Sequence, residues 1–185
     1  MATHPARRGW SYAEFARLPD DGNRYEVIDG ELFVTPSPRP AHQVVAGNLV
    51  ELLSPFVRRH KLGRVYPGPI DVLFGPGDYL VPDLVFVREQ QRGTVTERGV
   101  ESPPDLVVEI ISPSTADRDR GLKRERYAQF GVPEYWVIDP RLRRIEIYRA
   151  GGDRFPRVVS SGSIVWQPVP GGPQLDVQID DVFSD

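Results

Sequence analysis

The sequence predicts an α/β (α+β) fold, with a mixed, mainly antiparallel sheet flanked by a few helices. Short runs rich in Val, Ile, Phe and Tyr recur along the chain and are bounded by Pro or Gly, as strands are. Turn residues join neighbouring runs into N-terminal and C-terminal β-hairpins, and two other stretches have the three- and four-residue apolar spacing of helices. The 185 residues are enough for one well-cored domain and few for two, so we expect a single domain over 1–185.

The N-terminal part of the chain predicts a short helix and a hairpin. Ser11 and Glu14 have the spacing of a capping box, which favours a helix that begins at this point. The runs 25–28 and 31–34 flank an Asp-Gly pair, which is a strong signal for a two-residue hairpin turn.

The middle of the chain predicts one long helix and an antiparallel pair of strands. Apolar residues recur with helical spacing over 41–60, although Pro55 favours a kink or an early end. The runs 70–74 and 79–87 surround a Gly-Pro-Gly-Asp turn and are expected to pair. The polar stretch 88–103 is expected to be a long surface connection.

The C-terminal part predicts a strand, a helix and further strands. A second apolar run covers 104–111, and a helix capped by Asp117 or Asp119 is expected to run to Phe130 and stop at Gly131. The hairpin and the weaker strands that follow are expected at 134–138, 145–148, 155–160, 164–168 and 175–177.

Composition limits the classes of protein that fit. The net charge of -3 lacks the basic balance typical of DNA-binding domains, although a local basic face is compatible with it. The chain has no Cys, so any metal must be held by oxygen or imidazole ligands. It has no run of about 18 apolar residues and no apolar core of a signal peptide, so we expect a cytoplasmic protein without a membrane span.

Two acids stand inside the apolar runs. Asp83 follows Pro82, and Glu109 lies within Leu-Val-Val-Glu-Ile-Ile, where an ionised carboxylate is costly unless it is paired or binds a metal. If the two runs lie side by side, both carboxylates can bind a hard divalent cation such as Mg²⁺, which stabilises charge on a phosphoryl group. The alternative is that Asp83 is a polar residue at a strand edge and that Glu109 points outward or forms a salt bridge.

Other candidate residues follow or precede these acids. Lys123 and Tyr127 have (i, i+4) spacing on the expected helix, and a lysine near the ion can assist proton transfer or neutralise charge. The run of mixed charge around Lys123 equally fits a solvated helix face. His42 begins the long helix as a candidate ligand or proton shuttle, and Glu31 is a candidate third carboxylate.

The order of these motifs resembles the Uma family, which is assigned to the PD-(D/E)XK nuclease superfamily. The resemblance extends over nearly the whole chain and rests on the combination, since each piece alone is weak. It is carried by Tyr-Glu-Val-Ile-Asp-Gly-Glu ending at Glu31, by His42, by Val-Pro-Asp-Leu-Val around Asp83, by Pro-Asp-Leu-Val-Val-Glu-Ile-Ile-Ser-Pro-Ser around Glu109, by Lys123 and Tyr127, and by Gly-Val-Pro-Glu-Tyr-Trp-Val-Ile-Asp ending at Asp139.

The resemblance implies a restriction-endonuclease-like fold and a metal-dependent site. Asp83 and Glu109 would be the two acids of the motif, with the backbone carbonyl of Ile110 as a further ligand of Mg²⁺, for which Mn²⁺ is the expected substitute. The lysine of the motif would stand at the position of Ile111, so Lys123 is expected to reach the same space from the following helix. The resemblance assigns supporting roles to Glu31, His42 and Tyr127.

Three functions follow from the residues and the resemblance together. The first is a metal-dependent endonuclease that hydrolyses DNA phosphodiester bonds, for which the family analogy implies a homodimer. The second is a catalytically inactive restriction-fold module for protein or nucleic-acid interaction, which the acidic charge and the missing motif lysine favour. The third is glycoside hydrolysis by the paired carboxylates, which ranks last because no stripe of exposed aromatic residues is predicted.

Overall fold

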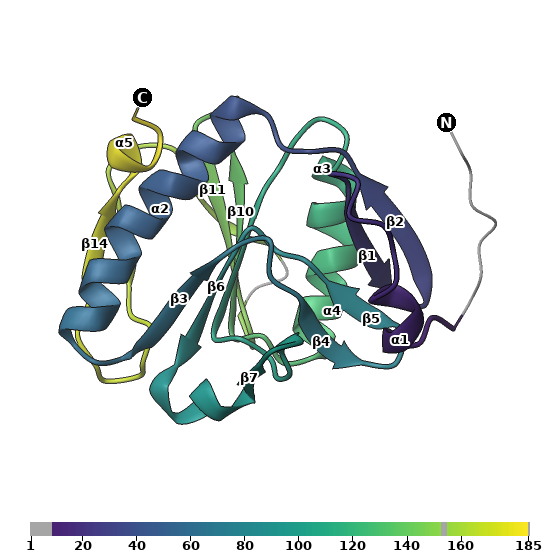
Figure 1. Cartoon of the computed structure of the whole chain (residues 1–185). Helices are drawn as coiled ribbons and strands as arrows, with labels where there is room; N and C mark the ends of the chain where they lie inside the picture. The colour runs from purple at the N-terminus through teal and green to yellow at the C-terminus, as the bar shows by residue number, and fades with distance from the viewer. Residues whose placement is uncertain (1–8, 153–154, 185) are drawn as a thin grey trace.

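Two six-stranded sheets, a two-stranded sheet and a long helix make up the computed structural model, which describes residues 9–152 and 155–184 (Figure 1). One six-stranded sheet, which lies in the middle of the molecule and is called the central sheet, has the strand order β12-β11-β10-β9-β6-β3. Within the described residues, β9 and β10 form its one parallel pair. Its strands are β3 (Gly63–Pro67), β6 (Leu84–Arg88), β9 (Leu106–Ile110), β10 (Glu134–Asp139), β11 (Arg144–Arg149) and β12 (Arg157–Val159).

The second six-stranded sheet, called the N-terminal sheet, has the order β2-β1-β5-β4-β8-β7. It includes the predicted first hairpin, whose turn residues Asp29 and Gly30 have φ angles of 52° and 77°, as a type I′ turn requires. A separate two-stranded sheet lies near the C-terminus. The strands of these two sheets are β1 (Arg24–Ile28), β2 (Glu31–Thr35), β4 (Val72–Gly75), β5 (Asp78–Leu80), β7 (Val95–Thr96) and β8 (Gly99–Val100), and then β13 (Ser163–Trp166) and β14 (Leu175–Gln178).

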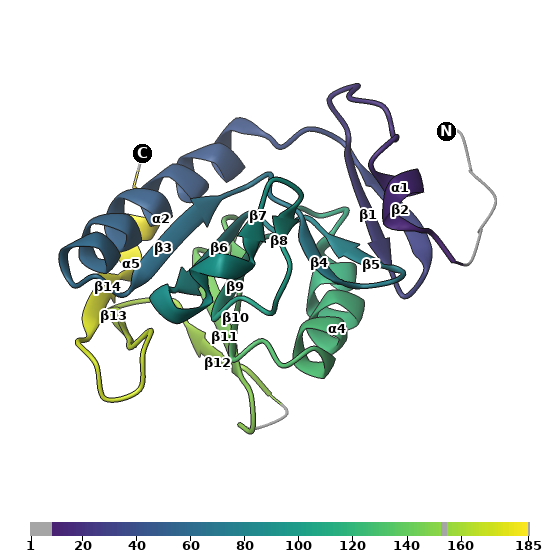
Figure 2. The same cartoon turned by 60° about the horizontal axis from the view of Figure 1, so that its bottom comes forward.

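Helices lie on both sides of the central sheet, as Figure 2 shows from a second direction. The long helix predicted over 41–60 is confirmed, and it continues through Pro55. Among the described helices, none combines the length and the apolar character needed to cross a membrane. The helical segments are α1 (Tyr12–Phe15), α2 (Pro40–Arg59), η1 (Glu89–Thr94), α3 (Ala116–Arg118), η2 (Asp119–Lys123), α4 (Arg124–Gln129) and α5 (Ile179–Val182).

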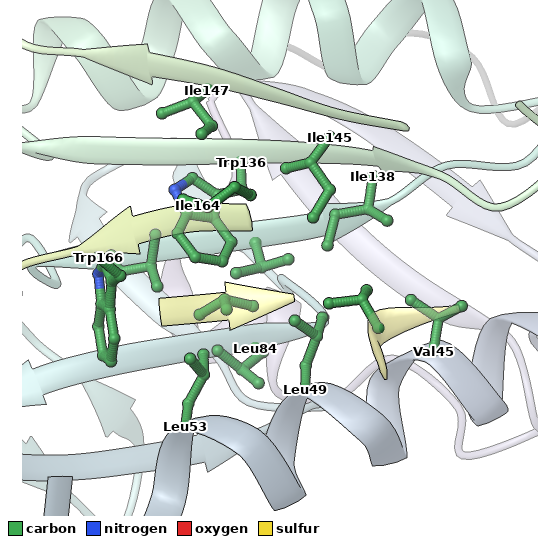
Figure 3. Packing of buried hydrophobic residues seen from close by; sticks show 14 of the residues in the cluster. Val45, Leu49, Leu53, Leu84, Trp136, Ile138, Ile145, Ile147, Ile164 and Trp166 are labelled. Carbon is green, nitrogen blue, oxygen red and sulfur yellow. The ribbon is translucent and has the colours of Figure 1, made fainter. Parts of the chain in front are cut away.

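Both faces of the central sheet are buried, which explains why its strands read as continuous apolar runs. Along β6, Leu84 and Phe86 belong to one cluster of buried side chains, and Val85 and Val87 belong to another. The helix α2 covers the first face with a stripe of buried residues that includes Leu49 (Figure 3). One of the two core clusters therefore lies between α2 and the central sheet.

The second face of the central sheet carries the candidate site. Tyr127 of α4 and the N-terminal sheet pack against this face, which includes Val85 and Val107. Side chains alternate along a strand, so Asp83 lies on the same face as Val85, and Glu109 lies on the same face as Val107. The strand pattern alone thus turns both acids toward α4.

The predicted fold class is confirmed, with three sheets in place of the single sheet expected. The prediction of one strand over 79–87 is wrong, because β5 and β6 join different sheets. Pro82 lies between them and has no N–H to donate, so the ladder ends there. The stretch 88–103 was predicted to be only a surface connection, but it contains η1, β7 and β8 and buries Val100.

The helix expected after Ile111 differs in its start and in its continuity. Neither Asp117 nor Asp119 caps it, because Thr115 takes the N-cap position. A π-helical turn, η2, separates α3 from α4. The predicted stop is confirmed by Gly131, whose φ of 80° favours glycine.

Asp71, just before β4, gives a stability prediction. Burial raises its pKa to about 6 from 3.8, so folding favours the neutral carboxyl, and the cost of the ionised form grows as pH rises between these values. We expect Asp71→Asn to raise the free energy of unfolding at pH 7.5 by about 1 kcal/mol, after allowance for solvent screening, and to change it little at about pH 4. Urea titrations at the two pH values measure this difference. An equal effect at the two pH values would contradict the burial of an ionised carboxyl group as the cause.

Candidate active site

The two acids of the apolar runs are neighbours on the central sheet. The strands β6 and β9 pair antiparallel with Leu84 opposite Val108, which places Asp83 beside Glu109. The Asp83 amide donates to the Val108 carbonyl at 3.1 Å, and the Ile110 amide donates to Asp83 Oδ2 at 2.7 Å. The expected side-by-side placement of the acids is therefore confirmed, while the ligand role of the Ile110 carbonyl stays a prediction.

Lys123 points toward the same acids. Its Nζ lies 2.5 Å from Glu109 Oε1 and 2.6 Å from Glu26 Oε1, and its side chain is 1% exposed. Asp119 Oδ1 lies 3.9 Å from the same nitrogen. Lys123 ends the π-helical turn η2, and such turns often occur at functional sites. The alternative that Lys123 lies on a solvated helix face is wrong.

Three other side chains contact the two acids. Arg24 donates to Asp83 Oδ1 at 2.7 Å, and His42 Nε2 lies 3.0 Å from Asp83 Oδ2. The Tyr127 hydroxyl donates to Glu109 Oε1 at 2.8 Å. His42 and Tyr127, which the resemblance assigns to supporting roles, thus both reach the site, and Arg24 is an addition that the spacing of motifs does not indicate.

Glu26 occupies the place expected for Glu31. Glu31 is exposed at the turn end of the first hairpin, opposite Ile28, and lies outside the pocket described below. Glu26 pairs with Phe33 nearer the open end of the hairpin, is 1% exposed, and accepts a hydrogen bond from the Val81 amide at 2.9 Å. Because Glu31 pairs with Ile28, both acids lie on the same face of the hairpin, and the alternation of side chains does not distinguish them.

The four buried side chains of Glu26, Asp83, Glu109 and Lys123 line a pocket of about 450 Å³ and are called its floor. Its walls come from the linker between β2 and α2, the loop after β9, the turns α3 and η2, and the turn after β10. Residues of both six-stranded sheets and of α2 therefore line the same pocket. The lining acids are Glu26, Asp83, Glu109 and Asp119, and the lining basic side chains are Arg24, Arg39, His42, Arg118, Lys123 and Arg141.

The pKa values of the two central acids are pushed in opposite directions. Burial raises the pKa of Glu109 to about 8, and the neighbouring acids add to this rise while Lys123 opposes it. Burial also acts to raise the pKa of Asp83, but His42 and Arg24 outweigh it and hold that pKa below its usual range. Burial lowers the pKa of Lys123, yet the acids around it more than reverse this and keep the ammonium charged. The surroundings thus move the pKa values of the two acids apart, a separation typical of catalytic pairs.

The donor set fits a hard divalent cation. Carboxylate oxygens are preferred ligands of Mg²⁺, and the pocket gathers four acids on its lining. Among the described residues, no three His, Cys, Asp or Glu side chains form a ready-made metal cage. The oxygens of Asp83 and Glu109 contact Arg24, His42 and Lys123 instead. An ion that binds the two acids would therefore compete with these basic groups for the carboxylate oxygens.

Gly68 supports the backbone of Asp83 and gives a further prediction. Its amide donates to the Asp83 carbonyl at 2.8 Å, and a Cβ on Gly68 would lie 2.5 Å from the Pro82 carbonyl oxygen. We therefore expect Gly68→Ala to displace this backbone and to lower the free energy of unfolding by about 1–3 kcal/mol. The matched control is Gly47→Ala in α2, which meets open space and should be neutral or stabilising. Thermal unfolding compares the two variants, and a Gly68→Ala protein as stable as wild type would contradict the close packing.

Comparison with known proteins supports the fold and gives the family. "Uncharacterized protein sll1609" of Synechocystis sp. is 26% identical over 131 residues, which cover 70% of this chain and 73% of that protein. The crystal structure of "a putative nuclease belonging to DUF820" from Anabaena variabilis matches with a TM-score of 0.77 and 22% identity, covering 93% of this chain and 96% of that one. This likeness shows the shared fold. A family model named Uma2, described as "Putative restriction endonuclease", matches residues 12–179, so the chain belongs to the Uma2 family.

Proposed function

We propose that this protein is a metal-dependent endonuclease that hydrolyses the phosphodiester bonds of DNA. The observation that carries the proposal is the meeting of Asp83, Glu109 and Lys123 on the floor of one pocket, with Lys123 Nζ 2.5 Å from Glu109 Oε1. Membership of a family described as "Putative restriction endonuclease" adds support. An acid pair with one nearby ammonium is a set of groups suited to phosphoryl transfer.

The carboxylates of Asp83 and Glu109 would hold the ion, which we expect to be Mg²⁺, with Mn²⁺ as a substitute. When bound, the ion supplies Lewis-acid stabilisation of the charge that develops on the phosphoryl oxygens. Arg24 and His42 keep Asp83 ionised, so this acid is ready to act as a ligand. The Tyr127 hydroxyl fixes the orientation of the Glu109 carboxyl group.

Lys123 would neutralise charge on the phosphate that is cleaved. Glu26 and Glu109 hold its ammonium at the floor of the pocket, where little solvent screens it. In the reaction, a water oxygen bonds to phosphorus, and the bond between phosphorus and one ester oxygen breaks. The water loses a proton and the leaving oxygen gains one, so that one product ends in a phosphate and the other in a hydroxyl group.

A cleavage assay tests this function. Labelled DNA, both single-stranded and duplex, is incubated with the protein in Mg²⁺, Mn²⁺ or EDTA. We expect cuts with either metal, none in EDTA, and none with Asp83→Asn. Asp105→Asn is the matched control, because Asp105 is a buried acid beside β9 that pairs with Arg88 outside the pocket. Cuts that persist in EDTA or in Asp83→Asn would refute the metal-dependent mechanism.

A catalytically inactive interaction module is the second candidate. The observation in its favour is that Asp83 forms an ion pair with Arg24, and Glu109 forms one with Lys123, so basic side chains of the protein itself already pair with both acids. In that case the protein would bind nucleic acid or protein without any metal-dependent cut. The assay above separates the candidates, because an inactive module gives no product under any metal condition.

We also propose a cytoplasmic homodimer, on the analogy of related nucleases in which two active sites act on two strands. Sedimentation velocity measures the mass of the assembly directly. A monomer at every concentration would refute the dimer, and it would leave the chemistry of each pocket unchanged.

A further inference from the structure

The charged side chains on the floor of the pocket are almost fully buried. The side chains of Asp83 and Glu109 are each 3% exposed, and that of Lys123 is 1% exposed. The pocket volume of about 450 Å³ is that of a site for one small molecule. A duplex is a stiff rod with a persistence length of about 150 base pairs, so bending its backbone into such a pocket costs free energy. An unpaired strand can enter, because its backbone is flexible and its bases can be splayed apart.

Two arginines that line the pocket have no acidic partner within residues 9–152 and 155–184. Arg39 lies in the linker before α2, and Arg141 lies in the turn after β10, and both residues are exposed. Neither guanidinium forms an ion pair with a described residue, whereas Arg24 and Lys123 are bound to the acids of the floor. An exposed, unpaired guanidinium is well suited to bind phosphate oxygens in a bidentate manner. The two arginines can therefore hold phosphates next to one that reaches the floor.

The walls of the pocket offer apolar surface without an aromatic platform. Pro36, Pro38, Pro113 and Pro140 are among the lining residues, and no Phe, Tyr or Trp lines the pocket in the described part of the chain. These proline rings can contact the faces of unpaired bases and have no side-chain group that hydrogen-bonds to base edges. Affinity is then expected to come mainly from phosphate contacts and to fall steeply with salt.

Building on the proposed function, we propose that the substrate is an unpaired DNA strand, or the unpaired end of a duplex, that enters the pocket and places its flanking phosphates on Arg39 and Arg141. The flexibility of an unpaired strand favours it over the stiff paired part of a duplex in a pocket of this size. Contacts to phosphate carry no sequence information, so we expect cleavage to be tolerant of sequence.

Fluorescence anisotropy in EDTA tests the binding step without cleavage. A labelled strand of about 20 nucleotides is compared with a blunt duplex of the same sequence, and we expect the strand to bind at least about fivefold more tightly. Arg39→Ala and Arg141→Ala should each weaken strand binding and reduce the slope of log K against log salt by about 0.7. Arg59→Ala is the matched control, since Arg59 is exposed at the opposite end of α2 and should affect neither quantity.

A cleavage experiment with Mn²⁺ separates this inference from the proposed function. We expect the free strand, and the single-stranded tail of a tailed duplex, to be cut at least about tenfold faster than the blunt duplex. Equal binding and equal cutting of the blunt duplex would overturn the inference while the nuclease function stands. If no substrate is cut but the strand preference and the arginine effects remain, the nuclease function alone is overturned. If neither arginine variant weakens strand binding, the assignment of the flanking phosphates to Arg39 and Arg141 is wrong.

Discussion

Glu109→Gln is expected to abolish cleavage while the protein stays folded. Glutamine keeps an oxygen for the Tyr127 hydroxyl, but it cannot become the anionic ligand that Glu109 would supply. Loss of one charged ligand removes several kcal/mol of transition-state stabilisation, so we expect the cleavage rate to fall by about a thousandfold or more. Burial raises the pKa of Glu109 and so favours a neutral side chain at this position, and Glu26 still pairs with Lys123 in the variant. We therefore expect the variant to remain folded in EDTA.

Glu146→Gln is the matched control for this substitution. Glu146 is 4% exposed on β11, and the register places it on the same face of the central sheet as Glu109. It binds Arg120 and Arg144 and lies outside the pocket. We expect the control to lose stability and to keep cleavage. A Glu109→Gln protein that cleaves DNA within about tenfold of wild type would contradict the assigned role of Glu109.

Lys123→Met is expected to have the largest combined effect. The substitution preserves an unbranched side chain and removes the charge, which leaves Glu26 and Glu109 buried without their shared partner. Breaking a buried ion pair in this way costs about 3–5 kcal/mol, and we expect a value near the lower limit because Glu109 can take up a proton. Loss of the ammonium should also lower the cleavage rate by about a hundredfold to a thousandfold.

A double variant separates the structural role of Lys123 from its catalytic role. When Glu26→Gln is added to Lys123→Met, one of the uncompensated charges is removed, so part of the lost stability should return. Cleavage should not return, because the ammonium is still absent. Urea titrations of wild type, both single variants and the double variant measure how far the two substitutions are coupled in stability. Cleavage rates of the same four proteins measure their coupling in activity. Recovery of cleavage in the double variant would contradict a direct role of Lys123 at the phosphate.

The sequence predicts the acid pair well because strand alternation is a local property. Asp83 and Glu109 each lie beside apolar runs whose period fixes the face on which the acids point, and the pairing of β6 with β9 then brings them together. The break between β5 and β6 is not predictable in the same way. Pro82 only shows that a ladder can end there, and the pairing of β5 with β1 depends on a distant contact between Val27 and Tyr79.

The parts of the site that the sequence does not predict depend on three-dimensional context. Glu26 and Glu31 belong to the same hairpin and have the same chemistry, and only the docking of its open end against the central sheet selects Glu26. Lys123 lies in a run of mixed charge that is typical of a solvated helix, and its burial depends on the π-helical turn η2. Arg24 and Gly68 act through contacts between residues far apart in the chain, which no local pattern reveals.

Calorimetric titration of Mn²⁺ into metal-free protein tests the central claim most directly, because it needs no assumption about the substrate. We expect wild type and Glu146→Gln to bind the ion, and we expect Asp83→Asn and Glu109→Gln each to weaken binding by at least about tenfold, with circular dichroism showing that all four proteins are folded. That result would place both acids in one metal site. Binding that is equally tight in wild type and in both acid variants would contradict the claim that Asp83 and Glu109 hold the ion.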